Sequence, residues 1–225
     1  MVVLDGGANR GAFARSLSTR FAGSYHAVEA NPSLAADLEL SGLYDTVANA
    51  AITDGDGRTA INLGYNDETS SVLPLPNTAT YNAIQVGSQD VRTVSLHTLL
   101  TTHPAATLLK LDIEGAEVAA LKALQRSDLA HLEQISVEFH GAPEFGFGLA
   151  GEVQDTIRYL RGFGFVSLDF AKQHRDTLFV AERLVPSSSV VVLWRLEASL
   201  RRTLAYAKKI TFYIKKLVGP TRTGP

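Results

Sequence analysis

The segment that most limits the folds open to this chain spans residues 2–13, VVLDGGANRGAF. A short apolar run ends in Asp5, passes through a glycine-rich turn and enters a helical pattern, which predicts a β-strand, a tight turn and a helix. Gly7 and Gly11 allow close approach of the backbone, and Asn9 is one of the few non-glycine residues that tolerate a positive φ. Backbone N–H groups at such a helix start can bind an anion. The segment therefore predicts an α/β protein whose first turn faces a ligand.

This turn does not fit the dinucleotide-binding pattern. G-x-G-x-x-G would need glycines at positions 7, 9 and 12, but Asn9 and Ala12 stand at the second and third of these. An NAD-linked oxidoreductase is therefore disfavoured. Asp5 would repel a pyrophosphate but can accept a hydrogen bond from an ammonium or hydroxyl group, and S-adenosylmethionine carries such an ammonium. The alternative is an ordinary strand-to-helix turn without a ligand.

A second apolar run, residues 25–29, ends in Glu29, which lies 24 residues after Asp5. A carboxylate at about this spacing holds a ribose diol in nucleotide-binding α/β folds. Asn31 and Pro32 end the strand, and a helix is expected over 32–40. Glu29 is therefore a candidate ribose ligand.

Strand-like runs recur along the chain, and most of the early ones alternate with helical patterns such as 12–21 and 116–124. This alternation predicts a mostly parallel, doubly wound sheet. The last two runs are separated only by residues 170–176, too few for a crossover helix, so they are expected to pair antiparallel. The expected strands span 2–4, 25–29, 46–52, 107–112, 134–139, 164–169 and 177–181, with candidates at 58–63 and 90–94 around an irregular stretch, 64–89, whose length favours a function.

Composition places the chain among globular proteins. Its 225 residues, 45% of them hydrophobic, suffice for one domain with an extension. The lack of cysteine excludes disulfides, thiolate nucleophiles and cysteine-ligated zinc, and it suits a cytoplasmic protein. Because the first strand begins at residue 2, we expect no signal peptide and a shortened N-terminus.

Charge divides the chain into two parts. The net charge is −2, but residues 187–225 carry eight Lys or Arg against one acid, Glu197, whereas residues 1–186 carry 13 basic and 22 acidic residues. We therefore expect a main domain over 1–186 and a basic tail over 187–225.

The tail has the pattern of an amphipathic helix over 190–217, with basic side chains on one half and apolar side chains on the other. Charges interrupt every stretch long enough to span a bilayer. Such a helix can lie peripherally in an anionic membrane interface, pack against its own domain or self-associate with a second copy. Nucleic acid is not an expected partner, because the rest of the chain is acidic. The basic set is Arg195, Arg201, Arg202, Lys208, Lys209, Lys215 and Lys216, and the apolar set is Leu193, Leu196, Leu200, Leu204, Ala207, Ile210, Ile214 and Leu217.

Four motifs in combination resemble those of the FkbM family of S-adenosylmethionine-dependent methyltransferases: residues 5–11, 28–32 (VEANP), 110–117 (KLDIEGAE) and 135–140 (ISVEFH). The resemblance covers roughly residues 2–183. It implies a Rossmann-like class I methyltransferase fold, α/β, with a mostly parallel seven-stranded sheet whose last strand is antiparallel, here followed by a C-terminal amphipathic helix. It also implies an O-methyltransferase that acts on a hydroxyl of a sugar, glycan or natural product.

The cofactor is expected along the first turn and the ends of the second and third strands, with adenine near residues 50–54. Asp54 could accept from the adenine amino group or begin a turn. Two departures stand out: Gly6 replaces the valine or isoleucine more common in the family, and the segment that usually precedes the first strand is absent. The second departure motivates an alternative, a non-catalytic member that serves as a cofactor-binding or membrane-tethered interaction module. The expected cofactor-binding residues are Asp5, Gly7, Asn9, Gly11, Glu29, Ala30, Ala51 and Asp112.

Ligands of open α/β sheets lie outside the carboxyl ends of the strands, where Asp112, Glu138 and His140 are expected to meet. Methyl transfer requires alignment of the acceptor oxygen and removal of its proton. His140 and Asp112 are the candidate bases, since a neutral imidazole with a pKa of about 6.5 suits this role, and Glu138 completes the expected catalytic set. Alternatively, these three residues and Glu114 could hold a divalent cation, Mg²⁺ or Mn²⁺, although this is not the favoured interpretation.

Structural alternatives exist for several of these side chains. Glu114 and Glu117 could stabilise the start of a helix through its dipole, and Lys110 is expected to pair with an acid. His140 could be a hydrogen-bonded residue at a strand end, and the two serines of the long loop could stabilise a turn. The residues expected to contact the acceptor are Ser70, Ser71, Glu114 and His140.

Overall fold

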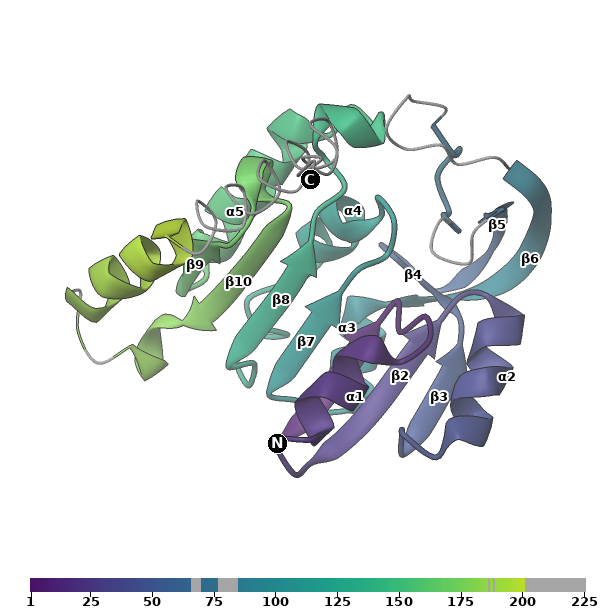
Figure 1. Ribbon diagram of the computed structural model, residues 1–225, viewed down its shortest axis with the longest axis horizontal. Helices are drawn as coiled ribbons and strands as arrows, with labels where there is room; N and C mark the ends of the chain where they lie inside the picture. Colours follow the sequence, from purple (N-terminus) through teal and green to yellow (C-terminus); the bar gives the residue numbers. More distant parts are fainter. Residues whose placement is uncertain (66–69, 77–84, 186, 188, 201–225) are drawn as a thin grey trace, which may run out of the picture.

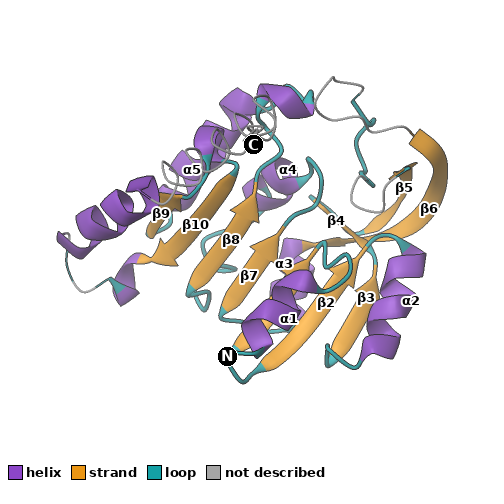
Figure 2. Ribbon diagram, in the orientation of Figure 1, coloured by secondary structure: helices purple, strands orange, loops and turns teal. Residues whose placement is uncertain are grey.

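The computed structural model describes residues 1–65, 70–76, 85–185, 187 and 189–200. A seven-stranded sheet forms its centre (Figures 1 and 2). The strands run in the order β3 (Thr46–Asn49), β2 (Ser24–Glu29), β1 (Val2–Gly6), β7 (Leu108–Leu111), β8 (Gln134–Glu138), β10 (Asp176–Ala181) and β9 (Phe165–Asp169). β1, β2, β3, β7 and β8 pair in parallel, whereas β10 is antiparallel to both of its neighbours. The predicted doubly wound sheet and its antiparallel last strand are confirmed.

Helices cover both faces of this sheet. α1 (Ala12–Ser18) and α2 (Pro32–Ser41) pack on one face, where Val3, Tyr25 and Leu108 form the core with Ala14. α3 (Leu96–Thr102), α4 (Glu117–Lys122) and α5 (Ala150–Gly162) belong to the larger core on the other face, with apolar side chains of β1, β7 and β8. Alternation along each strand sends successive side chains to opposite faces, so both layers are filled.

The expected strand over 46–52 is divided into two strands, because the chain leaves the main sheet at Ala50. Residues after this point form β4 (Ala51–Thr53), which joins β6 (Gln85–Ser95) and β5 (Gly57–Gly64) in a separate three-stranded sheet. β4 runs parallel to β6, and β5 and β6 pair antiparallel. Ala51 packs with Ile61 and Val91 in a small core between these strands. This burial of apolar side chains stabilises the position of β4 outside the main sheet. β5 and β6 contain the two further strand candidates and extend beyond them.

Two helices were not expected from the sequence. Ser95 caps α3, because its side chain accepts a hydrogen bond from the N–H of Thr98. α5 buries Val153, Ile157 and Leu160, which have the spacing of one helical face. Short 3₁₀ turns lie at Pro143–Phe145, Lys172–His174 and Glu182–Leu184. α1 ends at Ser18, short of the predicted end at residue 21.

A C-terminal helix is present over the described residues 189–200 (Figure 2). The remainder of the predicted amphipathic helix, residues 201–217, lies outside the described part of the chain. The division into a domain over 1–186 and a tail over 187–225 remains a prediction.

Candidate active site

The turn after β1 has the backbone geometry that its residues suggest. Gly7, Asn9 and Gly11 have φ values of 70°, 49° and 76°. A Cβ at Gly7 would lie only 1.8 Å from the carbonyl oxygen of Asp112, so the absence of a side chain lets the ends of β1 and β7 approach each other. Gly11 instead caps α1 and faces Leu43. A Cβ added to Gly11 would lie 2.8 Å from the Leu43 side chain. Gly7 and Asn9 line the cavity described below, whereas Gly11 serves helix packing and is not among its lining residues.

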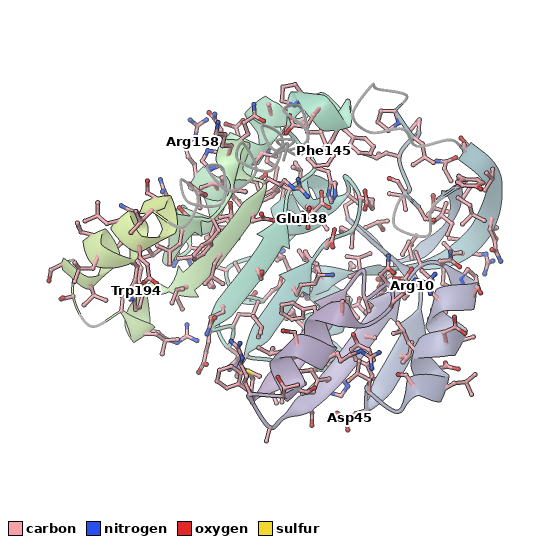
Figure 3. The ribbon with its side chains drawn as sticks, viewed as in Figure 1. Arg10, Asp45, Glu138, Phe145, Arg158 and Trp194 are labelled. Atoms are coloured by element: carbon pink, nitrogen blue, oxygen red, sulfur yellow. The ribbon has the colours of Figure 1, made fainter. Side chains whose placement is uncertain are left out.

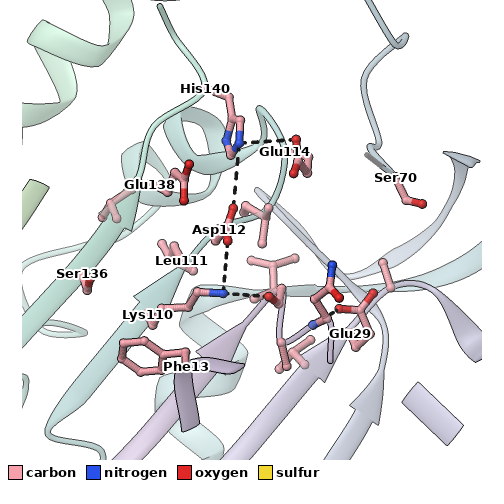
Figure 4. A pocket seen from close by; sticks show the side chains of 18 of the residues that line it. Phe13, Glu29, Ser70, Lys110, Leu111, Asp112, Glu114, Ser136, Glu138 and His140 are labelled. Carbon is pink, nitrogen blue, oxygen red and sulfur yellow. Dashed lines mark hydrogen bonds and ion pairs between the residues drawn. The ribbon is translucent and has the colours of Figure 1, made fainter. Parts of the chain in front are cut away.

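Glu29 lies at the carboxyl end of β2, as predicted, and its carboxylate is held by the backbone. Its two oxygens accept hydrogen bonds from the N–H groups of Asn9 and Asn31, both at 2.8 Å. Burial raises the pKa of Glu29, and these two N–H groups oppose the rise. Each carboxylate oxygen keeps a further lone pair, so the group can accept from two neighbouring hydroxyls. Glu29 lines the cavity (Figure 4).

Asp5 is placed differently from the expectation. Its side chain is fully buried, accepts a hydrogen bond from the Tyr44 hydroxyl at 2.6 Å and lies 3.4 Å from the Lys110 ammonium. It is not among the residues that line the cavity. Tyr44 and Lys110 both lie against the carboxylate that was expected to receive an ammonium, although its Oδ1 has no hydrogen-bond partner within the described residues, and a cofactor contact of Asp5 stays a prediction.

Lys110 joins the ends of β1 and β7. Its ammonium donates to the carbonyl oxygen of Gly7 at 2.7 Å and lies 3.5 Å from a carboxylate oxygen of Asp112. Together with the contact to Asp5, these interactions confirm that Lys110 is a paired lysine. The ammonium fixes Asp112 relative to the first turn.

His140 lies between acidic side chains just beyond the end of β8 (Figure 4). Its Nδ1 is 2.9 Å from Glu117 Oε1, and its Nε2 is 3.3 Å from Glu114 Oε2 and 3.8 Å from Asp112 Oδ1. Burial alone lowers the pKa of His140, but the three carboxylates outweigh it and raise the pKa to about 9. A pKa in this range favours a protonated ring at neutral pH over the expected neutral imidazole, and a protonated ring is not a proton acceptor; the catalytic role of His140 stays a prediction.

Glu117 is the buried partner of His140. The sequence had left two roles open for this residue, stabilisation of a helix start or a function in the site. Its carboxylate also accepts hydrogen bonds from the N–H groups of Ile113 and Gly115. Burial would raise the pKa of Glu117, yet His140 and the N–H groups hold it below its usual value. Glu117 therefore both ties down the loop before α4 and orients the imidazole. The only signal in the sequence is its place in the 110–117 motif.

Asp112 has the properties of a proton acceptor. Its side chain is partly exposed and lines the cavity. Burial raises the pKa of Asp112, while Lys110 and His140 oppose the rise. A carboxylate with a raised pKa is a stronger base than an ordinary aspartate.

Glu138 forms an ion pair with Arg175 and lines the same cavity as Asp112 and His140, and its expected catalytic role stays a prediction. Arg175 donates to Glu138 Oε1 through Nε at 3.0 Å and through Nη2 at 2.8 Å. The guanidinium also lies over the Phe145 ring, 5.4 Å from its centre, and Figure 3 labels Glu138 and Phe145 at this end of the sheet. Both members of the pair line the cavity. Arg175 was missed, because the segment 170–176 was interpreted only as a strand connection.

Ser70 and Ser71 have different roles. The Ser70 hydroxyl is buried, lines the cavity and has no hydrogen-bond partner within the described residues. The Ser71 hydroxyl donates to the carbonyl oxygen of Glu114 at 2.5 Å, and Ser71 is not among the lining residues. Ser70 thus faces the cavity, and its contact with a ligand stays a prediction, whereas Ser71 holds the loop that carries Glu114.

These groups surround one cavity of about 1110 Å³ at the carboxyl ends of β1, β2, β7 and β8. Its apolar end includes Ala30, Ala51 and Ile52, whereas its polar end includes Glu114 and Arg175. Such a cavity accommodates a nucleotide-sized ligand beside a second, polar molecule. Asp54 is exposed and does not line it, which agrees with a turn role.

A potential cation site is also present. Single ligand atoms of Asp112, Glu114 and His140 all lie within 4.8 Å of one another. Glu138, expected in the same set, is paired with Arg175 instead. Oxygen ligands with one imidazole suit Mg²⁺ or Mn²⁺, but His140 would first have to lose its Nε2 proton.

Comparison with known proteins agrees with the geometry. A family model described as the methyltransferase FkbM domain matches residues 5–167, more than half of the chain. No curated protein matches the chain. The strand order with its antiparallel β10, the Gly7 turn and the acidic group at the end of β7 all fall within or beside the matched range. The chain belongs to the FkbM methyltransferase family.

Proposed function

We propose that the protein is an S-adenosylmethionine-dependent O-methyltransferase that acts on a hydroxyl of a sugar, glycan or natural product. The observation that carries the proposal is a single cavity lined by both Glu29, at the carboxyl end of β2, and Asp112, just after β7; these two parallel strands flank β1. One carboxylate is suited to a ribose diol and the other to an acceptor proton.

The residues present fit the cofactor. The Gly7–Asn9 turn offers a backbone that a ligand can approach closely, and Glu29 has lone pairs for a diol. Ala30, Ala51 and Ile52 supply small apolar contacts for an adenine ring. When bound, this cofactor supplies an electrophilic methyl group on a sulfonium.

Asp112 is the proposed general base. Lys110 fixes the carboxylate from one side and His140 approaches it from the other, which leaves its partly exposed edge to meet the acceptor. General-base catalysis of this kind contributes about 10²–10⁴-fold to a rate. The acceptor proton passes to a carboxylate oxygen of Asp112.

His140 is proposed as a positioning residue in place of the expected base. As an imidazolium it is held by Glu117 through Nδ1, and its Nε2 attracts the carboxylates of Glu114 and Asp112 to fixed places on the cavity wall. It also balances the negative charge that three nearby carboxylates bring together.

The acceptor is proposed to be rich in hydroxyl groups. The polar end of the cavity presents Ser70, Glu114, Arg175 and Asp176, a mixture of donors and acceptors suited to hydroxyls. A purely apolar acceptor would leave these groups without partners, at a cost in binding free energy.

We favour a reaction without a divalent cation, because Nδ1 of His140 hydrogen-bonds with Glu117 and the protonated Nε2 already neutralises charge on Glu114 and Asp112. Turnover that survives dialysis against EDTA would agree with this. Turnover that is lost in EDTA and restored by Mg²⁺ or Mn²⁺ would assign Asp112, Glu114 and His140 as ligands instead.

The cofactor is tested by titration calorimetry with S-adenosylhomocysteine. We expect micromolar binding to the intact chain and a loss of at least about tenfold in Glu29→Ala, since two hydroxyl contacts disappear. The absence of binding to the intact chain would overturn the cofactor assignment.

Turnover distinguishes an enzyme from the non-catalytic module. With an acceptor found by screening glycans, Asp112→Asn should bind S-adenosylhomocysteine normally and lose about 10²–10⁴-fold in turnover. Asp54→Asn, an exposed aspartate outside the cavity, is the matched control. Cofactor binding without turnover on any acceptor would favour the non-catalytic role, and unchanged turnover in Asp112→Asn would contradict its assignment as the base.

A further inference from the structure

The C-terminal helix, residues 189–200, carries an apolar stripe on its outer side. Leu193, Leu196 and Leu200 are 63%, 62% and 59% exposed, and Val192 is 55% exposed. At 100° per residue these four side chains fall within about 100° of one another on the helix surface. Large apolar side chains gathered in this way mark an interaction surface more often than scattered ones do.

The opposite side of the same helix is already covered. Ala198 is buried, and Val190, Val191 and Trp194 are half-buried (Figure 3 labels Trp194). The helix therefore has two apolar sides, one covered and one facing outward. Of the predicted apolar half, the described residues Leu193, Leu196 and Leu200 face outward.

The charge of the sequence around this helix favours an anionic partner for the outer stripe. Residues 187–225 carry eight basic side chains and one acidic one, whereas the rest of the chain is acidic. Beyond Leu200 the sequence repeats basic pairs at 201–202, 208–209 and 215–216, with apolar residues between them. Anionic lipid surfaces attract clustered Lys and Arg, and apolar side chains beside such a cluster enter the headgroup region.

We propose that the helix containing Leu193, Leu196 and Leu200 docks the protein peripherally on an anionic lipid surface. A second copy of the chain is the weaker partner, because it would bring two strongly basic segments together, whereas an anionic surface compensates their charge. No helix in the described part of the chain is long and apolar enough to cross a membrane. The proposal is independent of the methyltransferase reaction.

The test is flotation of the full chain with vesicles of phosphatidylglycerol and phosphatidylcholine, compared with vesicles of phosphatidylcholine alone. We expect the protein to float with the anionic vesicles and to be released at high salt, because screening weakens attraction between exposed charges. The variant L193S/L196S/L200S should bind at least about tenfold more weakly, since three apolar side chains no longer enter the lipid.

Leu40→Ser is the matched control, since Leu40 is 87% exposed on α2, outside this helix. Far-UV circular dichroism and thermal unfolding show whether the triple variant is folded. Equal flotation of the triple variant and the parent chain, or no flotation of either, would overturn the proposal. A third result would also overturn it: by light scattering the parent chain is a dimer and the triple variant a monomer, and neither binds vesicles. The stripe would then be a self-association surface.

Discussion

The Nδ1 atom of His140 lies 2.9 Å from Oε1 of Glu117, and both side chains are buried. Glu117 is the first residue of α4, and His140 follows the end of β8. Their hydrogen bond therefore joins the start of this helix to the end of this strand. The N–H groups of Ile113 and Gly115 complete the surroundings of the carboxylate. The pair therefore links the stability of the fold to the geometry of the cavity wall.

Removal of Glu117 should be costly. Glu117→Ala leaves a buried imidazole and two N–H groups without their acceptor, and loss of one member of a buried ion pair costs about 3–5 kcal/mol in the free energy of unfolding. Urea unfolding measures the loss. Glu39→Ala, an exposed glutamate on α2, should stay within about 0.5 kcal/mol of the parent chain. A similar small effect for both variants would show that the pair contributes little.

The stability of the protein should fall in alkaline solution because of His140. Its pKa is raised from 6.5 to about 9 in the folded state. The folded state therefore holds the proton more tightly than the unfolded state, a stabilisation that is complete below pH 6.5 and disappears as the pH rises through about 9. The shift corresponds to about 3 kcal/mol.

Urea unfolding at several pH values between neutral and alkaline, in the parent chain and in His140→Gln, measures this effect. The parent chain should lose stability across the range, and the variant should be weaker at neutral pH with a flatter dependence. An equally steep dependence in both proteins would assign the titration to another group.

Much of the fold follows from local signals in the sequence. Asp5, Glu29 and Asp112 each end an apolar run before a turn, and parallel strands bring their carboxyl ends to one edge. The shortness of 170–176 sufficed to predict the antiparallel β10. The break after Asn49 was not predictable in the same way, because it depends on the pairing of β4 with β6, about 40 residues further along the chain.

The charge state of the site could not be predicted, since it depends on distances between residues far apart in the sequence. A lone histidine after a strand suggests a neutral imidazole, but three carboxylates around His140 reverse this. Asp5 is a similar case, because Tyr44, whose hydroxyl donates to Asp5 Oδ2, lies 39 residues away. The contact of Arg175 with Glu138 could not be predicted either, because it depends on the pairing of β8 with β10.

Gly7→Ala should destabilise the fold and remove cofactor binding. Two effects combine here, a φ of 70° and a Cβ 1.8 Å from the carbonyl oxygen of Asp112. Gly42→Ala separates them, because Gly42 has a φ of 65° but no atom within 4 Å of an added Cβ. The control should cost only the left-handed conformation, about 1–2 kcal/mol, whereas Gly7→Ala should cost several kcal/mol more. Thermal unfolding and S-adenosylhomocysteine titration measure both variants, and equal losses would contradict close approach at Gly7.

Ser71→Ala should weaken acceptor binding without changing cofactor binding. The Ser71 hydroxyl donates to the backbone carbonyl oxygen of Glu114 at 2.5 Å and accepts from the N–H of Leu73 at 3.0 Å. This bond supports Glu114 at a φ of 54°, which non-glycine residues rarely adopt. Without this bond the Glu114 carboxylate is less well placed, and one hydrogen bond corresponds to an increase of about three- to tenfold in the KM of the acceptor. The affinity for S-adenosylhomocysteine should stay the same, because Glu29 and Asn9 are untouched.

Ser88→Ala, an exposed serine in β6 of the same small sheet, is the matched control. A parallel loss of cofactor affinity in Ser71→Ala would mean that Ser71 supports the whole cavity and not the acceptor side alone.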